Sequence, residues 1–264
     1  MGDDGRLRRL GHLNLVEYCR EQARWSGADG AVEERGGIVL FAAGSDFPVL
    51  VNGAFALDPA VGPSELPDVA DDWFGTRGRG YTVFAGEVDG GPELAAAAEA
   101  RAMLPVLDMP EMVVRAPVEE RPLPAGTRLR WVADDASMAD FVAVQAGAYA
   151  TYGMPGDVAT RTITDLRAFT EPQVHSVVAY LDGEPVAGAQ TVLSHGIAGV
   201  YWVGTLEPAR GRGLGDAVTR AVTNRAFSLG ATANSLQAST MGEAIYARMG
   251  YEALYRYVGY VRFP

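Results

Sequence analysis

Lysine is absent from this sequence and cysteine occurs only once, which excludes two familiar kinds of chemistry. A nucleotide-binding loop of the Walker type needs a lysine after its last glycine. An intrachain disulfide needs a partner for Cys19, which the chain does not have. Histidine occurs three times without metal-ligand spacing, so no metal site is predicted.

Long apolar runs and net positive charge are also lacking. No stretch is long enough to span a bilayer, and the first residues do not have the apolar core of a signal peptide. We therefore expect a cytoplasmic protein without a membrane partner. The formal charge of −11 argues against nucleic acid as a partner. It is compatible with a cationic or amine substrate, although such charge more often serves solubility.

A segment rich in glycine and arginine joins a predicted strand, residues 199–206, to a predicted helix, residues 214–229. It reads Arg210-Gly211-Arg212-Gly213-Leu214-Gly215. Small residues expose backbone N–H groups at the positive end of a helix, and arginine adds charge, so the segment predicts a phosphate-ester site. A dinucleotide fingerprint does not fit, because its third glycine would fall on Asp216 or Val218.

The spacing R-x-x-G-x-G after a strand resembles the pyrophosphate arm, [QR]-x-x-G-x-[GA], of the GCN5-related N-acetyltransferase (GNAT) superfamily. Arg210, Gly213 and Gly215 match this pattern. The superfamily's second element is also present: a predicted strand near residues 234–238, then a predicted helix over 241–249 that carries Tyr246 and ends in Gly-Tyr. One departure is Ser239, which stands where many members carry asparagine.

The resemblance implies acetyl-CoA as co-substrate and direct attack of an amine on its thioester. Cys19, in a predicted helix, is expected to be a buried structural residue, which agrees with a reaction without a covalent enzyme intermediate. Tyr246 is the implied catalytic residue, either returning a proton to the thiolate or only packing against the co-substrate. The implied cofactor-binding residues are Gly204, Thr205, Leu206, Arg210, Gly211, Arg212, Gly213, Leu214, Gly215 and Ser239.

The general base and the acceptor pocket are less determined. Glu207, His195, His175 and a water relay are all considered as the base, and the sequence favours none of them. The family's acceptor site implies a pocket between the helical region 148–169 and the strand after Tyr251. Its candidate lining residues, which could equally be plain core, are Tyr149, Tyr152, Met154, Tyr255, Tyr257 and Tyr260.

The chain divides at a segment rich in proline and charge, residues 116–126. We predict a mixed α/β fold of two tandem GNAT-like copies: residues 1–118, a linker at 119–126, and an acetyltransferase domain over 127–264. The first copy looks degenerate. Its presumed cofactor turn, residues 86–92, carries Glu87 and Asp89 in place of arginines, so we expect it to bind no co-substrate and to shape the cleft of the second copy.

Three functional hypotheses follow. The first is an N-acetyltransferase that transfers acetyl from acetyl-CoA to a primary amine of a small molecule or peptide, with the monomer and the homodimer both left open. The second is a non-catalytic module that binds or senses acyl-CoA. The third is a tandem acetyltransferase of the mycothiol synthase kind. The sequence identifies neither the amine nor the acyl chain length.

Overall fold

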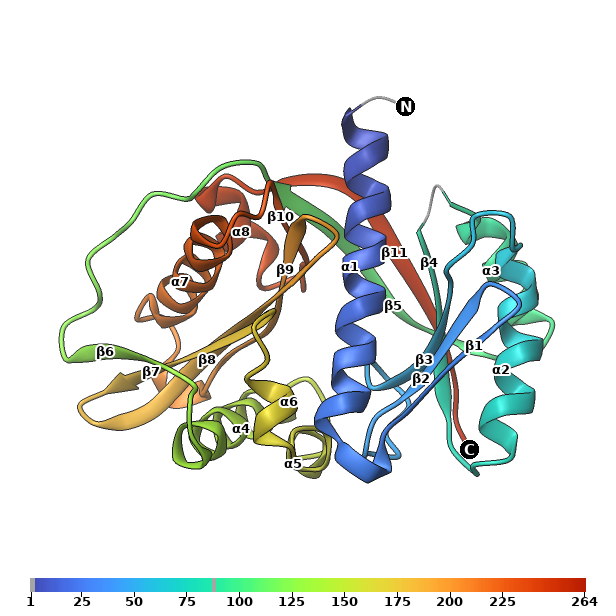
Figure 1. Cartoon of the computed structure of the whole chain (residues 1–264), viewed down its shortest axis with the longest axis horizontal. Coiled ribbons are helices and arrows are strands. Elements are labelled where there is room, and N and C mark those ends of the chain that lie inside the picture. Colours follow the sequence, from blue (N-terminus) through green and yellow to red (C-terminus); the bar gives the residue numbers. More distant parts are fainter. Residues whose placement is uncertain (1–2, 87–88) are drawn as a thin grey trace.

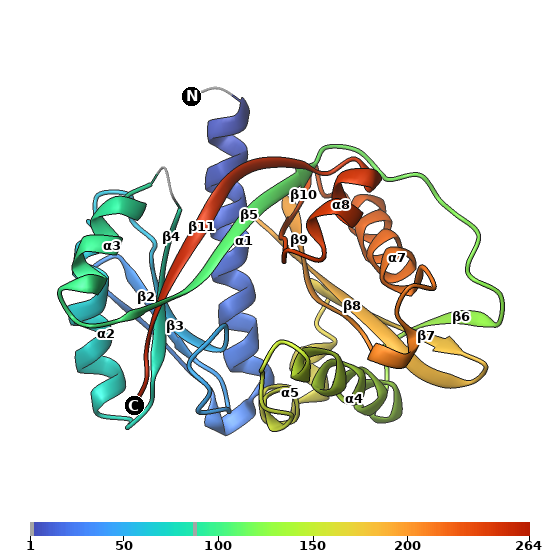
Figure 2. The ribbon, with the colours of Figure 1, turned by 180° about the vertical axis from the view of Figure 1, so that it is seen from behind.

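The computed structural model describes residues 3–86 and 89–264 of the chain. Strands from both halves join one mixed sheet of 11 strands (Figures 1 and 2). The first half supplies β1 (Ala31–Arg35), β2 (Ile38–Ala42), β3 (Asn52–Ala56), β4 (Tyr81–Gly86) and β5 (Leu104–Val114). The second half supplies β6 (Thr127–Trp131), β7 (Val174–Leu181), β8 (Glu184–Ser194), β9 (Ile197–Thr205), β10 (Asn234–Gln237) and β11 (Glu252–Arg262).

The order across the sheet is β1-β2-β3-β4-β11-β5-β10-β9-β8-β7-β6. The two halves have a similar arrangement of strands on either side of its centre. Strands β3 and β4 are parallel and enclose helix α2 (Leu66–Gly75), as β9 and β10 are parallel and enclose α7 (Leu214–Ser228). Helices α3 (Gly91–Glu99) and α8 (Glu243–Met249) then lead to β5 and β11. The mixed α/β fold of two related copies is thus as predicted.

The two copies exchange their last strands at the centre of the sheet. Strand β11, from the second half, pairs antiparallel with β4 of the first half. Strand β5, from the first half, pairs antiparallel with β10 of the second half. The two exchanged strands also pair with each other from Glu252↔Val113 to Val261↔Leu104. Backbone hydrogen bonds therefore run without interruption from one half to the other.

Helices cover both faces of the sheet because its strands alternate between two apolar cores. On β2, Ile38 and Leu40 join the core beneath α2 and α3, whereas Val39 and Phe41 join the core on the opposite face. That second core is continuous across both halves. It lies beneath α1 (Asp3–Trp25), α4 (Asp135–Ala150), α5 (Asp157–Thr162) and α6 (Leu166–Phe169), while α7 and α8 cover the other face of the second half.

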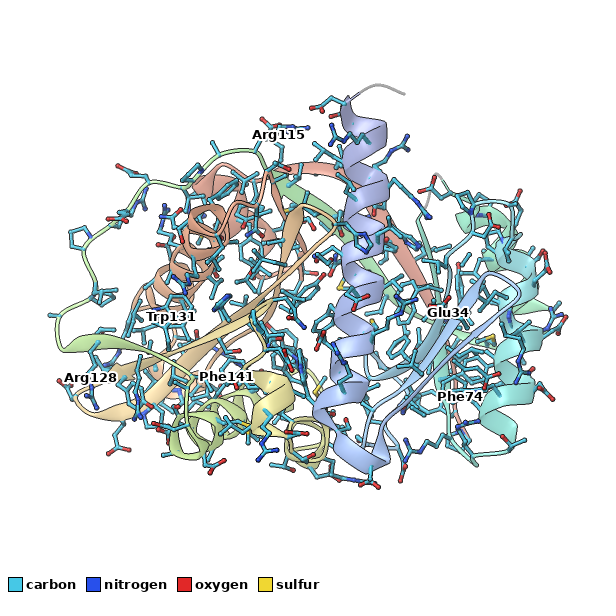
Figure 3. All side chains as sticks on the ribbon, viewed as in Figure 1. Glu34, Phe74, Arg115, Arg128, Trp131 and Phe141 are labelled. Atoms are coloured by element: carbon cyan, nitrogen blue, oxygen red, sulfur yellow. The ribbon has the colours of Figure 1, made fainter. Side chains whose placement is uncertain are left out.

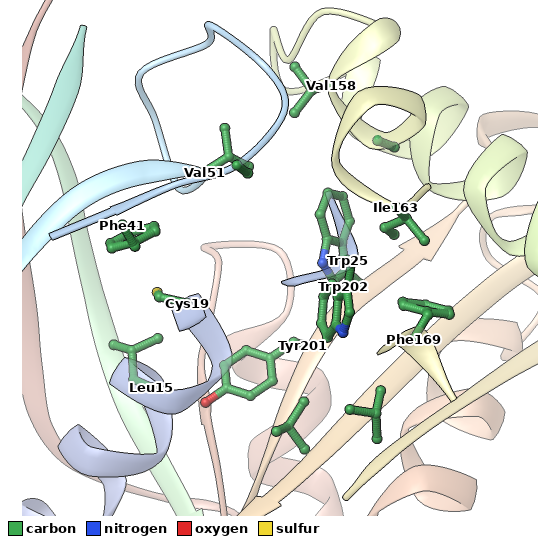
Figure 4. Packing of buried hydrophobic residues seen from close by; sticks show 14 of the residues in the cluster. Leu15, Cys19, Trp25, Phe41, Val51, Val158, Ile163, Phe169, Tyr201 and Trp202 are labelled. Atoms are coloured by element: carbon green, nitrogen blue, oxygen red, sulfur yellow. The ribbon is translucent and has the colours of Figure 1, made fainter. Parts of the chain in front are cut away.

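Helix α1 belongs to the first half but packs against the second. Its Asn14 donates from Nδ2 to the carbonyl of Val192, 3.0 Å away, and accepts from the Tyr201 hydroxyl at 2.7 Å. Figure 4 shows Leu15 and Cys19 of α1 between Phe41 on one side and Tyr201 on the other. At the exposed surface, Arg115 joins the start of α1 to β11 through Asp4 and Glu252 (Figure 3).

Several boundaries differ from those expected from sequence. The helix predicted over 155–169 is divided into α5 and α6, because the N–H groups of Thr164 and Asp165 donate to the Trp25 carbonyl and Asp165 then caps α6. The sequence predicts only a short strand at 106–108, where β5 runs over 11 residues. Its Pro105 and Pro110 are accommodated in pairing with β11 that is irregular in two places. Strand β1 was not predicted.

Residues 115–126 form neither helix nor strand, and Val118 and Glu119 in this segment are held against α7. The Val118 N–H donates to the Asn224 side chain, and the Arg220 guanidinium donates to the Glu119 carbonyl. The division into 1–118, 119–126 and 127–264 remains a prediction. Because of the strand exchange, segment 1–118 needs β11 to complete its part of the sheet, and segment 127–264 needs β5.

The predicted equivalence of the 86–92 turn was wrong. By topology, the counterpart of Arg210–Gly215 precedes α2, because α2 and α7 each connect two parallel strands. Each of these helices also follows a short 3-10 helix, which is Pro63–Glu65 before α2 and Glu207–Ala209 before α7. The true counterpart, residues 57–65, contains Asp58 and Glu65 and no arginine. Glu87 lies outside the described residues. We therefore still expect the first half to have no basic phosphate loop, on the basis of residues 57–65 and not of residues 86–92.

We predict that Gly199→Ala lowers the free energy of unfolding by about 2 kcal/mol, because overpacking a buried contact forces its neighbours apart. A Cβ at this position would stand 2.2 Å from Asn14 Oδ1 and 2.4 Å from the Tyr201 hydroxyl. Denaturant unfolding measures the change. Gly75→Ala, where a Cβ meets nothing within 4 Å, is the matched control and should be close to neutral. Equal stability of the two variants would contradict the packing of α1 on β9.

Candidate active site

The parallel strands β9 and β10 separate after a short contact. They pair only at Asn234↔Ala198 and Ser235↔Gly199, although β9 continues to Thr205 and β10 to Gln237. Beyond this point the two strands no longer share hydrogen bonds, so an opening forms in the sheet at their carboxyl ends. Openings of this kind, outside the carboxyl ends of parallel strands, are where α/β sheets bind ligands.

A bulge in β9 faces this opening. Gly188 pairs with Gly204 and Gln190 pairs with Tyr201, so Trp202 and Val203 of β9 stand opposite a single residue of β8. The backbone of Trp202 has a φ of 48°, a conformation that non-glycine residues rarely adopt. Because a bulge turns the side chains of its strand, it accounts for the presence of consecutive β9 residues at one cavity wall.

A cavity of about 410 Å³ adjoins the opening and extends between the two halves. Its walls are apolar and rich in aromatic rings, and no charged side chain is among the described residues that line it. The second half contributes Tyr149, Tyr152, Met154, Val200, Tyr201, Trp202, Val203, Leu236, Gln237, Ser239, Tyr246 and Tyr257. The first half contributes Leu15, Tyr18, Cys19, Phe47, Val49, Leu50, Phe55, Phe84, Val106, Leu107 and Met109.

The Arg210–Gly215 loop has the backbone of an anion site. Gly211 and Gly213 have φ values of 76° and 77°, which only glycine adopts without strain. The N–H groups of residues 211–213 donate to no backbone carbonyl in the described structure, and the first helical bond of α7 is donated by Ala217 to Gly213. Free N–H groups at the start of a 15-residue helix fit a diphosphate.

The two arginines of this loop differ in their surroundings. Arg210 is bound within the protein, since it donates to the Thr205 carbonyl at 3.1 Å and to the Thr151 hydroxyl at 2.7 Å. It therefore ties the loop to the end of α4. Arg212 is exposed and makes no ion pair among the described residues, so its charge is available to a ligand.

The predicted pantetheine-contacting segment lies beside the cavity and not in its wall. Gly204 must be glycine, because a Cβ would stand 2.4 Å from Gln145 Oε1 and 2.8 Å from Ala148 Cβ of α4. Thr205 accepts from Arg210, and the Leu206 N–H donates to the Val186 carbonyl. Contacts of these residues with a co-substrate stay a prediction. Sequence reasoning missed the earlier part of β9, which the bulge turns into the cavity.

Tyr246 and Ser239, predicted from the second motif, both line the cavity. Ser239 accepts at Oγ from the Gly242 N–H, 3.2 Å away. A Cβ on Gly242 would stand 2.6 Å from the Tyr246 ring, so glycine lets that ring lie against the turn before α8. Burial raises the pKa of Tyr246, so its phenol stays protonated and can donate a hydrogen bond.

None of the suggested bases reaches the cavity wall. Glu207 is exposed, His195 lies in the exposed turn between β8 and β9, and His175 packs its ring edge-on to Trp131. Among the suggested pocket residues, Tyr149, Tyr152, Met154 and Tyr257 do line it, whereas Tyr255 and Tyr260 do not. Cys19 is buried as expected, and burial raises its thiol pKa well above the ordinary value.

Glu111 of β5 is a buried carboxyl group that sequence reasoning did not consider. It lies on the exchanged strand, directly opposite Gln237 of β10, and accepts from Gln237 Nε2; Gln237 lines the cavity. Burial raises the pKa of Glu111 to about 7. Gly11 of α1 makes room for it, since a Cβ there would stand 2.8 Å from Glu111 Oε1. Glu111 lies beside the second half only because of the strand exchange, and no local sequence pattern indicates this position.

Within residues 3–86 and 89–264, no cluster of three acidic, histidine or cysteine side chains is arranged to hold a metal ion. Over the same residues, no helix combines the length and apolar character needed to cross a membrane.

Comparison with known proteins agrees with the geometry. Residues 119–243 match the family model described as an acetyltransferase (GNAT) domain. The fold is similar to a GCN5-related N-acetyltransferase from Kribbella flavida, with 25% identity over 93% of this chain and 94% of that one and a TM-score of 0.69. It is also similar to a tandem GNAT protein from the clavulanic acid biosynthesis pathway, with 14% identity, 99% and 96% coverage and a TM-score of 0.59. No curated protein matches the sequence.

Residues 119–243 therefore form a GNAT acetyltransferase domain, as the motifs of this region predicted. This match implies acetyl transfer that depends on acetyl-CoA. The second solved structure adds that the tandem arrangement exists in another protein of the same fold.

We predict that Glu111 makes stability fall as the pH rises. Its folded-state pKa is about 7 against 4.5 for the unfolded chain, so its contribution is complete below pH 4.5 and is lost as the pH passes 7. Denaturant unfolding between pH 5 and 8 should therefore show a loss of up to about 3 kcal/mol that Glu111→Gln removes. Glu120→Gln, at an exposed position, is the control and should keep the wild-type slope. Parallel curves for wild type and Glu111→Gln would contradict a buried, uncharged Glu111.

Proposed function

We propose that the protein is an N-acetyltransferase that moves the acetyl group of acetyl-CoA to a primary amine held in the central cavity. The observation that carries the proposal is the shared position of three features. Strands β9 and β10 separate where both line the cavity, and Tyr246 lines the same cavity. The Arg210–Gly215 loop, with its free N–H groups, joins the end of β9 to α7.

The residues of this region suit the parts of acetyl-CoA in turn. The N–H groups of residues 211–213 and the Arg212 guanidinium would bind the diphosphate, where opposite charge and the helix dipole act together. Ser239 and the turn before α8 would flank the pantetheine arm as it passes the opened strands. Arg210 acts indirectly, because its side chain already holds the loop against Thr151 of α4.

Acetyl-CoA, when bound, supplies the activated acetyl group, and the protein's own groups handle position and protons. The cavity orients the amine and excludes water from it. Burial raises the pKa of Tyr246, so its phenol keeps its proton and is a weaker acid than a thiol. It would stabilise the departing thiolate by donating a hydrogen bond to the sulfur. The proton that the amine releases as the amide forms neutralises the thiolate.

A second candidate function is binding or sensing of acyl-CoA without turnover. One observation favours it: no carboxylate or imidazole is among the described residues that line the cavity. An amine that enters uncharged needs no strong base to become a nucleophile, so this observation does not outweigh the acetyltransferase. The mycothiol synthase hypothesis is less favoured, because a sugar-bearing acceptor would meet apolar walls.

We predict that Arg212→Ala weakens acetyl-CoA binding about tenfold, the effect expected when a charge-assisted hydrogen bond is removed. Gly213→Asp should weaken it further, because it adds negative charge beside the diphosphate and forces a non-glycine residue to a φ of 77°. Isothermal calorimetry measures both affinities, with Arg167→Ala on the exposed surface of α6 as the control. Unchanged dissociation constants in both loop variants would remove the site.

We predict that Tyr246→Phe lowers kcat by about 100-fold while the dissociation constant of acetyl-CoA changes little, since the hydrogen bond to the departing thiolate forms only in the chemical step. Steady-state release of free thiol measures kcat, and calorimetry measures binding in the same preparation. If kcat stays at the wild-type value, Tyr246 only packs against the co-substrate. If no amine releases thiol from the wild type although acetyl-CoA binds, the sensing function replaces the enzyme.

A further inference from the structure

The cavity wall restricts which amines can enter. A cationic group placed among apolar side chains loses its hydration, which costs several kcal/mol unless an opposite charge compensates. The described lining residues offer phenol, amide, hydroxyl and thiol groups but no carboxylate. The negative net charge of the chain therefore does not reflect an acidic acceptor pocket, and an amine must occupy this site in its uncharged form.

The aromatic side chains give the cavity flat walls. The rings of Tyr18 and Tyr201 are stacked with centroids 3.7 Å apart. Tyr149 meets Trp202 edge-on at 5.3 Å. At the other end, Phe55 and Phe84 of the first half are stacked at 4.6 Å. Walls of this kind gain most from a planar, ring-bearing ligand, because aromatic pairs contribute beyond their buried area.

A directed hydrogen-bond acceptor lies at the end of the cavity that the first half encloses. His12 Nε2 is 2.8 Å from the Ala56 carbonyl, and His12 Nδ1 is 2.8 Å from the Tyr257 hydroxyl. A carbonyl can only accept, so Nε2 carries the hydrogen of the neutral ring and Nδ1 accepts from Tyr257. The Tyr257 proton is thus committed to His12, so the Tyr257 oxygen can only accept, from the neighbouring Tyr255 phenol and with its second lone pair from the cavity.

The position of Tyr257 separates it from the reacting end. It lies on β11, two strands away from β10 in the sheet, and strands are about 4.8 Å apart. The backbone of Tyr257 is therefore roughly 10 Å from that of β10, which is the scale of one aromatic ring with a short side chain. A ligand that reaches both ends places its amine at the opening and its opposite end at Tyr257.

We propose that the cavity is the acceptor site for an uncharged, ring-bearing primary amine with a hydrogen-bond donor at the end remote from the amine. This inference rests on the proposed function and adds the class of acceptor. The first half supplies the recognition: Phe55 and Phe84 pack on the ring, and His12 fixes the Tyr257 oxygen as the acceptor of the distal donor. The degenerate copy is then a specificity element for the active one.

Three probe amines test this assignment: 4-(2-aminoethyl)phenol, 2-phenylethylamine and 1,4-diaminobutane, each with acetyl-CoA. We expect kcat/KM for the phenol to exceed that of 2-phenylethylamine about fivefold, the value of one hydrogen bond. The diamine, whose second charge would be buried, should be at least about 100-fold slower than either ring-bearing amine. Comparable rates with the diamine would overturn the assignment.

Two variants locate the preference in the structure. Tyr257→Phe should reduce the phenol preference to about one, with 2-phenylethylamine little affected, and His12→Phe should reduce it as well. Tyr260→Phe, on the same strand but outside the cavity wall, is the control and should keep the preference. Because each preference is a ratio within one preparation, partial loss of folded protein does not alter it. A preference that survives Tyr257→Phe would overturn the proposed contact.

Calorimetry with the ring-bearing amines alone separates this inference from the proposed function. Binding of both amines with the same ratio of affinities supports the acceptor site even if acetyl-CoA fails to bind, which would refute the acetyltransferase. Acetyl-CoA binding and turnover of other amines, without binding of the ring-bearing ones, refutes the acceptor class and leaves the acetyltransferase in place.

Discussion

Backbone hydrogen bonds between β5 and β11 hold the two halves of this protein in one sheet. Every residue pair between β5 and β11 joins positions more than 130 residues apart. In addition, β11 pairs with β4 of the first half, and β5 pairs with β10 of the second half. The relative position of the halves is therefore determined by main-chain geometry and not by side-chain packing alone. The central cavity depends on this constraint, because its lining residues come from both halves and include residues of β5 and β11.

Helix α1 completes the enclosure over the sheet. It begins in the first half, yet Asn14 uses both ends of its amide to bind β8 and β9 of the second. Gly11 and Gly199 keep this packing close, each by leaving out a side chain where a neighbouring oxygen lies. Leu15, Tyr18 and Cys19 then form one cavity wall. The first half, which has no arginine at residues 57–65 before α2, thus supplies a helix and strands that shape the central cavity.

Sequence predicted the parts of this protein that depend on local chemistry. The Arg210–Gly215 spacing, the strand before it and Tyr246 after it identified the superfamily, and most strand and helix limits in the second half agree within a few residues. Prediction from the sequence failed where residues far apart in the chain determine the local structure. Nothing near Pro105 or Pro110 indicates a long strand, because the partner that makes it one is β11. Glu111, His12 and the cavity-facing part of β9 were missed for the same reason: their neighbours come from elsewhere in the chain.

The exchange also has a consequence for biosynthesis. When the ribosome has made the first half, the edge of β4 that pairs with β11 has no native neighbour, since β11 begins only at residue 252. The first half therefore reaches its native sheet only after β11 has been made and inserted between β4 and β5.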